Sequence, residues 1–349
     1  MTGNSFLMTK RVIMDTTTRH DDLISVIIPA YNAEAWIDET LRSVRSQTHA
    51  NIEIVVVDDG SRDATVEIVH RHAAADPRVR IIRQENGGVA AARNRGIAET
   101  SGPFIAPVDA DDLWAPTKLE EQLRLMHERG ERVGLVYCWY AMIDGKGRIT
   151  HLDSRSEAEG DVLKRLCLSN IVGNGSSALM RRSAVIEAGG YDSGLRAARA
   201  QGCEDYKLYF EIAERYEYAL VRDYLTGYRD LPDNMSSDLW QMLRSRDLCI
   251  KEFQQRHPEL TSLFRAGRCR LMRFMVARAL RTGRLHEGRA MLGQMIRYAP
   301  HRAAIEISHL AKNAARSVWN KHLPSKARRK VVGERFLIGE IRCPNRGRP

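Results

Sequence analysis

Cysteine is scarce and scattered in this sequence, with six residues among 349 and no C-x-x-C pair. This spacing argues against a disulfide framework and a structural zinc site, and it fits a reducing compartment. Long apolar runs are also absent. The N-terminus has no apolar stretch of signal-peptide length, and no segment approaches the roughly 18 apolar residues that a membrane span needs. The sequence therefore predicts a cytoplasmic protein with a polar, disordered N-terminus over residues 1–21.

Two phosphate-binding signatures are missing from the sequence as well. There is no glycine-rich loop followed by lysine, which argues against a sugar-phosphate nucleotidyltransferase. No G-x-G-x-x-G follows an apolar run, which argues against a dehydrogenase.

Charge is unevenly distributed along the chain. Residues 1–240 carry 29 Lys and Arg against 37 Asp and Glu, whereas residues 241–349 carry 25 against 7, a balance of +18. A basic tail on an acidic body suits an anionic surface, either a membrane leaflet or nucleic acid. The acidic half and the lack of interleaved aromatic and basic residues argue against specific nucleic-acid binding.

Apolar runs and helical periodicity alternate through the first 140 residues. The runs predict strands at 24–29, 52–57, 79–83, 104–108 and 133–140, and helices between them at 33–48, 63–75, 89–99 and 116–129. This alternation predicts an α/β fold, with a mainly parallel sheet and right-handed crossovers. Further on, the pattern predicts a hairpin turn at 144–147, a strand at 174–180, helices at 183–188 and 204–216, and an almost wholly helical region from about 237.

Chemically distinctive residues follow the predicted strands, where ligands of parallel sheets bind. The segment FIAPVDADDLWAP ends an apolar strand in three carboxylates, Asp109, Asp111 and Asp112. Carboxylates beside a buried strand repel one another and are costly to desolvate. A divalent cation, Mg²⁺ or Mn²⁺, would remove that cost. The alternative is a turn in which Asp112 faces a helix N-terminus.

The order and spacing of several segments resemble family 2 glycosyltransferases. The segments are SVIIPAYNAEAWIDETLRSVRSQTHANIEIVVVDDGSRDAT, NGGVAAARNRGI and VDADDLWAP. The resemblance covers about residues 22–235 and implies a GT-A fold, with a nucleotide-binding half at 22–140 and an acceptor half at 141–236. It also implies sugar transfer with inversion from a nucleoside diphosphate donor, with UDP favoured. The acceptor would be a glycan or a lipid-linked glycan of cell-surface polysaccharide synthesis.

The resemblance also implies roles for residues of the nucleotide-binding half. Tyr31 would stack on the base, and Asp59 would accept a hydrogen bond from the uracil ring. Arg93 would reach the nucleotide or diphosphate, Asp109 would contact the ribose or the metal, and Asp111 would bind the metal directly. Pro29, Asn32 and Gly88 complete the predicted nucleotide site. The alternatives are a loop-anchoring aromatic for Tyr31, a helix cap for Asp59 and a solvated surface residue for Arg93.

In the acceptor half, Glu204 and Asp205 resemble the acidic pair of the family. Asp205 is the predicted base for the acceptor hydroxyl, with Glu204 second, and the alternative is charge balance at a helix N-terminus. The resemblance also implies that Asn174, Ser176 and Ser177 line the donor-sugar pocket. Leu231 stands where many members have a histidine that helps to hold the metal or diphosphate, so Arg229 is predicted to compensate on the phosphates.

The remaining chain divides into a helical extension at 237–322 and a basic tail at 323–349. Within residues 302–322, apolar side chains at helical spacing are flanked by Arg302 and Lys312. This pattern favours an interfacial helix on anionic lipid, which would hold residues 302–349 at the inner face of the cell membrane. The alternative is a helix packed on the catalytic domain. A nucleotidyltransferase and a non-enzymatic basic nucleic-acid-binding protein remain the competing functions.

Overall fold

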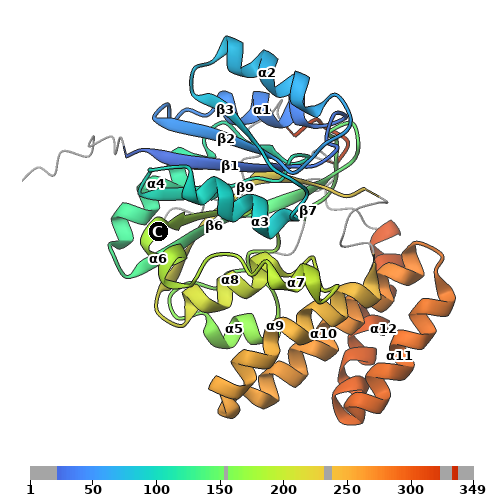
Figure 1. Cartoon of the computed structure of the whole chain (residues 1–349). Coiled ribbons are helices and arrows are strands. Elements are labelled where there is room, and N and C mark those ends of the chain that lie inside the picture. The colour runs from blue at the N-terminus through green and yellow to red at the C-terminus, as the bar shows by residue number, and fades with distance from the viewer. Residues whose placement is uncertain (1–21, 153–155, 232–237, 323–331, 337–349) are drawn as a thin grey trace, which may run out of the picture.

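The computed structural model describes residues 22–152, 156–231, 238–322 and 332–336 of the chain, excluding the predicted disordered N-terminus. A mixed β-sheet lies between helices in the upper part of Figure 1, and a layer of long helices lies below it. The α/β class predicted from the alternation of strand and helix patterns is confirmed.

The first half of the sheet is parallel, as predicted. Strand β1 (Ile24–Ala30) pairs with β2 (Ile52–Asp58) and β4 (Phe104–Pro107), and β2 pairs with β3 (Val79–Arg83). Helix α3 (Val89–Ala98) packs on β1 and β2. Helices α1 (Ile37–Arg45), α2 (Thr65–Ala75) and α4 (Lys118–Arg129) share one apolar core with the sheet.

The second half of the sheet differs from the predicted parallel order. Strand β8 (Ala178–Arg181) runs antiparallel between β4 and β6 (Val133–Ile143). The hairpin turn predicted at 144–147 is confirmed, because β6 and β7 (Ile149–Leu152) pair antiparallel across it. The short strand β5 (Leu113–Trp114) pairs antiparallel with β9 (Glu217–Arg229).

Strand β9 is the longest element that the sequence pattern did not predict. It pairs in parallel with β6, and the register shifts where Cys138 faces Val221 and Trp139 faces Tyr224. Arg222 and Asp223 are therefore accommodated in an irregularity of the ladder. A bulge of this kind breaks the period of two that identifies a strand from sequence.

Helices cover the other face of the sheet in the acceptor half. They are α5 (Leu163–Leu168), α6 (Arg182–Glu187), α7 (Gly194–Ala197) and α8 (Glu204–Ala213). A short 3-10 turn at Gly175–Ser177 precedes β8, so the strand predicted from residue 174 begins only at Ala178.

The helical extension is confirmed in the described residues from 238 to 322. It consists of α9 (Leu239–Arg256), α10 (Thr261–Arg281), α11 (Leu285–Tyr298) and α12 (Pro300–His322), with a short turn at Pro258–Leu260. Helices α10 and α11 form a helical hairpin. The extension is integral to the acceptor half, because Phe253 of α9 lies on Phe210 of α8 with ring centroids 4.7 Å apart.

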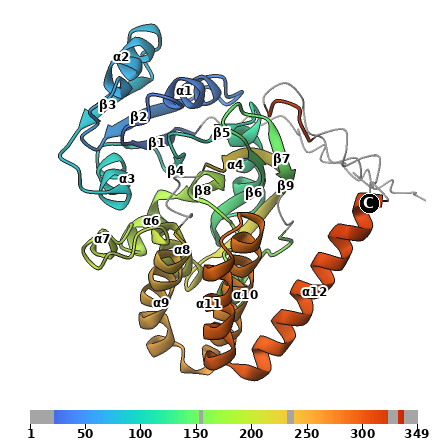
Figure 2. The ribbon, with the colours of Figure 1, turned by 90° about the vertical axis from the view of Figure 1, so that its right-hand side faces the viewer.

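The first turns of α12 pack on the extension. Ala303 is buried, and Ile307 and Leu310 pack against the methionine-rich core of α10 and α11. Part of the apolar face predicted to enter lipid is therefore used inside the protein, and it contacts the extension rather than the catalytic sheet. Figure 2 shows α12 diverging from α11 along its length.

A short segment of the predicted basic tail returns to the sheet. The N–H of Phe336 donates to the carbonyl of Gly147 at 3.0 Å, and the N–H of Ile149 donates to the carbonyl of Glu334 at 3.0 Å. The Phe336 side chain is buried in the core of the acceptor half. In the described part of the chain, no helix combines the length and the hydropathy of a membrane span.

Candidate active site

The three carboxylates after β4 lie in three different environments. Asp112 is fully buried, and its carboxylate accepts hydrogen bonds from Ser176 Oγ at 2.5 Å and from the N–H of Arg229 at 2.9 Å. Burial, followed by the charges of Asp111 and Asp109, raises the pKa of Asp112 well above its usual range. Asp112 therefore links the turn that carries the three carboxylates, residues 109–112 and called the carboxylate turn below, to β9 and to the 3-10 turn before β8.

Arg229 is enclosed beside this turn. Its Nε donates to the carbonyl of Asp111 at 2.7 Å and a terminal nitrogen pairs with Glu39 at 2.9 Å. The guanidinium also lies over the ring of Trp36, 4.6 Å from its centroid. Since the side chain has no exposed surface, a contact with donor phosphates would require it to leave these partners.

Asp109 pairs with Arg93, which projects from α3. Arg93 is almost completely buried, and its guanidinium lies over the ring of Tyr191 at 5.1 Å from the centroid. Burial alone would lower the pKa of Arg93, but Asp109 and, less strongly, Tyr191, Asp205 and Glu204 raise it. The surface-arginine alternative is therefore wrong, and Arg93 joins the carboxylates of both halves of the domain.

Asp111 is the carboxylate of this turn that is best suited to a cation. Burial, and then the neighbouring charge of Asp109, raises its pKa to about 6. A divalent cation between Asp111 and Asp109 would offset both effects. No cluster of three metal-ligating side chains occurs among the described residues. An ion held by these two carboxylates would therefore need its other ligands from phosphate and water.

Glu204 and Asp205 begin α8, as the acidic pair was expected to do. Glu204 is buried, and its carboxylate accepts a hydrogen bond from the N–H of Gly202 at 2.8 Å. Burial raises the pKa of Asp205 to about 6, the charge of Arg93 lowers it, and Glu204 raises it further. A pKa raised to about 6 is closer to the range that suits a general base than that of an ordinary aspartate.

The predicted base-stacking residue lies at the end of β1. Tyr31 is 52% exposed, so its ring is free of the core. Asn32 follows with a positive φ of 48°, donates its N–H to Ser61 Oγ and accepts from the N–H of Arg62. Pro29 is buried within β1 opposite Val57, so it shapes this edge from below.

Asp59 is bonded to the glycine turn before α3. Its carboxylate accepts from the N–H groups of Gly87 and Gly88, at 2.7 and 2.8 Å, and from Gln84 Nε2 at 2.8 Å. Gly88 has a φ of +90°, and a Cβ there would lie 2.9 Å from Cδ of Arg196. Because both backbone partners precede Val89, the first residue of α3, Asp59 fixes the glycine turn and does not cap the helix. Capacity for one more hydrogen bond is left on its carboxylate.

The residues predicted to line the sugar pocket are mostly bonded within the protein. Asn174 Oδ1 accepts from the N–H of Ser176 and from the hydroxyl of Ser177. Ser176 Oγ accepts from the N–H of Asp109 at 3.0 Å. Both serines are fully buried, so they hold the carboxylate turn in place. A Cβ at Gly175 would lie 2.6 Å from a terminal nitrogen of Arg93, which explains the glycine.

Unpartnered polar atoms gather at this centre. Among the described residues, Arg93 Nε, Asn174 Nδ2 and Tyr191 Oη are buried without a hydrogen-bond partner. Such atoms are rare in folded proteins and require an explanation. All three can donate a hydrogen bond, which suits the oxygens of a diphosphate or a sugar.

Tyr191 and its support are the functional residues that sequence reasoning missed. The side-chain amide of Asn94 donates to the carbonyl of Tyr191 at 2.7 Å and accepts from its N–H at 2.9 Å. Asn94 directly follows Arg93, so one turn of α3 fixes both residues. The signal in the sequence is the aromatic after Gly189 and Gly190, which both have positive φ and close α6.

Two relatives from Bacillus subtilis illustrate the sequence similarity. The chain is 43% identical over 118 residues to EpsH, which is named as a glycosyltransferase, a match that covers 34% of this chain and 33% of EpsH. It is 27% identical over 242 residues to TuaG, named as a teichuronic acid biosynthesis glycosyltransferase, covering 69% of this chain and 92% of TuaG. The matched region thus spans a third of one relative and nearly all of the other.

Solved structures share the fold. Residues 1–349 of S. aureus TarS, in complex with UDP-GlcNAc, align with a TM-score of 0.59 at 18% identity, over 80% of this chain and 82% of that one. A mannosyltransferase of Pyrobaculum calidifontis, in complex with GDP-Man and Mn²⁺, aligns with a TM-score of 0.51 at 19% identity, over 85% and 87%. Residues 25–189, which contain β1, the glycine turn and the carboxylate turn, match the family model described as glycosyl transferase family 2.

Proposed function

We propose that this glycosyltransferase moves a sugar, with inversion, from a nucleoside diphosphate donor to a hydroxyl of a glycan or lipid-linked acceptor. UDP is the proposed nucleotide, and the product would be a cell-surface polysaccharide. UDP-GlcNAc in the TarS complex and the naming of TuaG for teichuronic acid synthesis support this choice of chemistry.

The observation that carries the proposal is the group of unpartnered donors around Arg93. Arg93 Nε, Asn174 Nδ2 and Tyr191 Oη are buried without partners between the carboxylate turn and the start of α8. A diphosphate or sugar bound there would satisfy donors that are otherwise costly to bury. A purely structural cluster would have no reason to leave three donors unpaired.

The donor would lie along the carboxyl ends of the strands. Tyr31 would stack on the base, at about 1–3 kcal/mol for an aromatic contact, with Pro29 and Asn32 shaping that edge. The free position on Asp59 would accept from the base, beside Gly88. Asp109 and Asp111 would hold Mg²⁺ or Mn²⁺, which when bound neutralises charge on the departing diphosphate.

Asp205 would act as the base on the acceptor side. Its carboxylate accepts the proton of the acceptor hydroxyl while the oxygen of that hydroxyl attacks the anomeric carbon. The bond from that carbon to the diphosphate breaks on the opposite face, and the nucleoside diphosphate leaves with the electron pair. Arg93 would limit the charge that accumulates between Asp205 and Asp109, since it is attracted to both.

The proposal also includes the location of the reaction. We propose that the chain acts in the cytoplasm, with residues 302–349 in peripheral contact with anionic lipid. The basic balance of residues 241–349 supports this contact. Ile307 and Leu310 pack on the extension, so these two side chains are not part of the proposed lipid contact.

Donor hydrolysis and nucleotide binding test the proposal together. We expect the full chain to bind UDP in the presence of Mn²⁺ and to hydrolyse one member of a panel of nucleotide sugars slowly. A nucleotidyltransferase would instead form a nucleotide sugar from a triphosphate and a sugar phosphate. A nucleic-acid-binding protein would bind DNA with a steep dependence on salt. Either of these results without UDP binding would contradict the proposal.

A further inference from the structure

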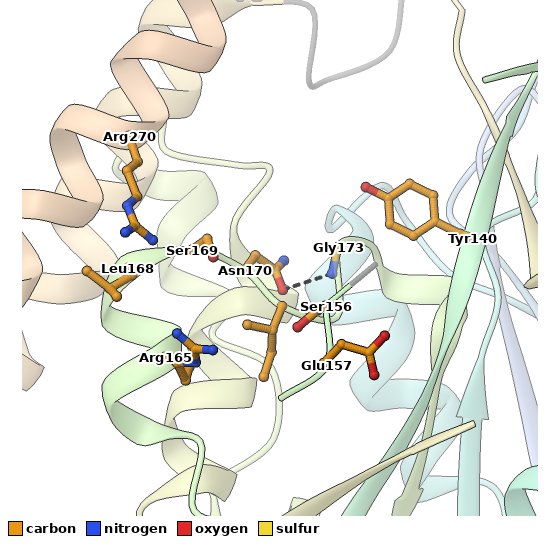
Figure 3. Close-up of a pocket in the computed structure, with 10 residues that line it drawn as sticks. Tyr140, Ser156, Glu157, Arg165, Leu168, Ser169, Asn170, Gly173 and Arg270 are labelled. Atoms are coloured by element: carbon orange, nitrogen blue, oxygen red, sulfur yellow. Dashed lines mark hydrogen bonds between the residues drawn. The ribbon is translucent and has the colours of Figure 1, made fainter. Parts of the chain in front are cut away.

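A polar cavity lies beside the proposed active site, between the acceptor half and the helical extension. Its volume is about 380 Å³, within the range of small-molecule sites. Tyr140 of β6, Arg165 of α5, Asn170, Gly173 and Arg270 of α10 line it, as Figure 3 shows. Arg165 and Arg270 lie on one side, and the Tyr140 ring lies on the other with its hydroxyl toward the space between them.

The cavity shares a loop with the reacting centre. Gly173 lines the cavity, while Gly175, two residues further along, lies against the Arg93 guanidinium and the Asp109 carboxylate. Asn170 Oδ1 accepts from the N–H of Gly173 at 3.0 Å and fixes this loop. A molecule in the cavity is therefore separated from the donor-side contacts by only the chain around residue 174.

The cavity holds positive charge that the protein does not neutralise. In the described parts of the chain, neither Arg165 nor Arg270 makes an ion pair or a side-chain hydrogen bond. Glu157 also lines the cavity, but it pairs with Arg222 at 2.9 Å outside it. Two guanidinium groups with unused donors favour an oxyanion, which each can bind with two hydrogen bonds.

We propose that this cavity is an acceptor subsite for a glycan that carries an oxyanion, bound by Arg165 and Arg270. The inference rests on the proposed glycosyltransferase function and names the chemical class of its acceptor. The shared chemistry is a negatively charged oxygen group on or beside the sugar ring, either a phosphate or a carboxylate. The Tyr140 ring would cover the apolar face of the same sugar.

Binding of three matched probes to the full chain tests the subsite. The probes are methyl glucoside, methyl glucuronide and methyl glucoside 6-phosphate, which differ only in the group at carbon 6. With UDP and Mn²⁺ present, we expect at least one anionic probe to bind about tenfold more tightly than the neutral one, because a charged hydrogen bond is worth about that factor. The two anionic probes separate a phosphate from a carboxylate preference.

Variants then assign the preference to the two arginines. Arg165→Ala and Arg270→Ala should each weaken the anionic probe about tenfold, while the neutral probe and UDP bind as before. Arg270→Lys should recover only part of the loss, since lysine cannot bind an oxyanion through a guanidinium fork. Arg265→Ala is the matched control, because Arg265 is another exposed arginine of α10 that does not line the cavity.

The outcomes distinguish failure of the anion subsite from failure of the proposed glycosyltransferase function. If neither anionic probe binds more tightly than methyl glucoside, or if the preference survives both arginine substitutions, the subsite assignment is wrong. UDP binding that persists in that case leaves the glycosyltransferase proposal intact. Absence of UDP binding would contradict the glycosyltransferase proposal, whereas an arginine-dependent anion preference would still support the anion site.

Discussion

Replacement of Asp205 by asparagine separates a catalytic carboxylate from a structural one. Asp205→Asn is nearly isosteric and removes the basic oxygen. The loss of a general base costs about 10²–10⁴-fold in rate, so we expect kcat to fall by that factor. UDP affinity should stay nearly unchanged, because Asp205 itself makes none of the proposed donor contacts.

Asp205→Asn should lower the rate but raise the free energy of unfolding. Burial raises the folded-state pKa of Asp205 to about 6, above the ordinary range of an aspartate, which is about 4. A carboxyl with a raised folded pKa is protonated more readily in the folded state, so the parent loses stability as pH rises from about 4 to 6. A shift of about two pKa units corresponds to about 3 kcal/mol in the free energy of unfolding. Loss of the favourable charge at a helix N-terminus reduces this gain by about 0.3–1 kcal/mol. We expect asparagine to raise the free energy of unfolding at pH 8 by about 2 kcal/mol.

Two measurements on the same protein test this reasoning. Thermal unfolding at pH 8 should show a higher midpoint for Asp205→Asn than for the parent, and the difference should shrink to about half at pH 5. Transfer or donor hydrolysis should fall as described. Glu204→Gln is the control, because glutamine keeps an oxygen that can accept from the N–H of Gly202, so the rate should fall far less than in Asp205→Asn.

The helix-charge alternative makes the opposite prediction. If Asp205 only balances the N-terminus of α8, asparagine should lower the unfolding midpoint at pH 8 and leave the rate unchanged. That result would refute both the catalytic assignment and the cause given for the raised pKa. If Glu204→Gln abolishes transfer while Asp205→Asn does not, the base is Glu204.

Four further expectations concern the rest of the molecule. Asp111→Asn should abolish divalent-dependent turnover, whereas full activity in this variant and an EDTA-insensitive parent would contradict a metal role. Mn²⁺ should bind weakly alone and more tightly with UDP, by a coupling of about 1–3 kcal/mol; tight binding of Mn²⁺ without nucleotide in a titration would contradict this. Tyr31→Ala should weaken UDP binding by about 1–3 kcal/mol in calorimetry, and an unchanged affinity would exclude stacking. Phe336→Ala should lower the free energy of unfolding by about 3 kcal/mol, because its ring is buried on the acceptor half; an unchanged denaturation midpoint would show that the segment is not docked.

The parallel half of the fold could be predicted because its strands are simple apolar runs. Each lies at the centre of the sheet or is covered by helices, and such strands appear in a sequence as nearly continuous apolar runs. The strands of the acceptor half are harder to recognise in the sequence. Strand β9 carries Arg222 and Asp223 in the register irregularity, and β8 is four residues long and preceded by a 3-10 turn. Neither feature has a periodic signal in sequence.

Placement after a strand predicted which residues meet at the site but not what each one does there. The Asp109 pairing with Arg93 follows from α3 and β4 being neighbours of β1. The burial of Arg229 depends on Trp36 and Glu39, almost 200 residues away in the chain. Such a long-range contact cannot be read from the spacing of local motifs. The return of Phe336 to Gly147 is of the same kind.

The three neighbouring carboxylates can coexist because the fold gives each a different compensation. Asp109 has the charge of Arg93, and Asp112 has two internal hydrogen bonds. Asp111 has a backbone hydrogen bond and the charge of Arg229, which together do not offset burial and the charge of Asp109, so its pKa stays raised. The charged form of Asp111 is therefore only partly compensated by the protein, and a cation brought in with a diphosphate would stabilise it.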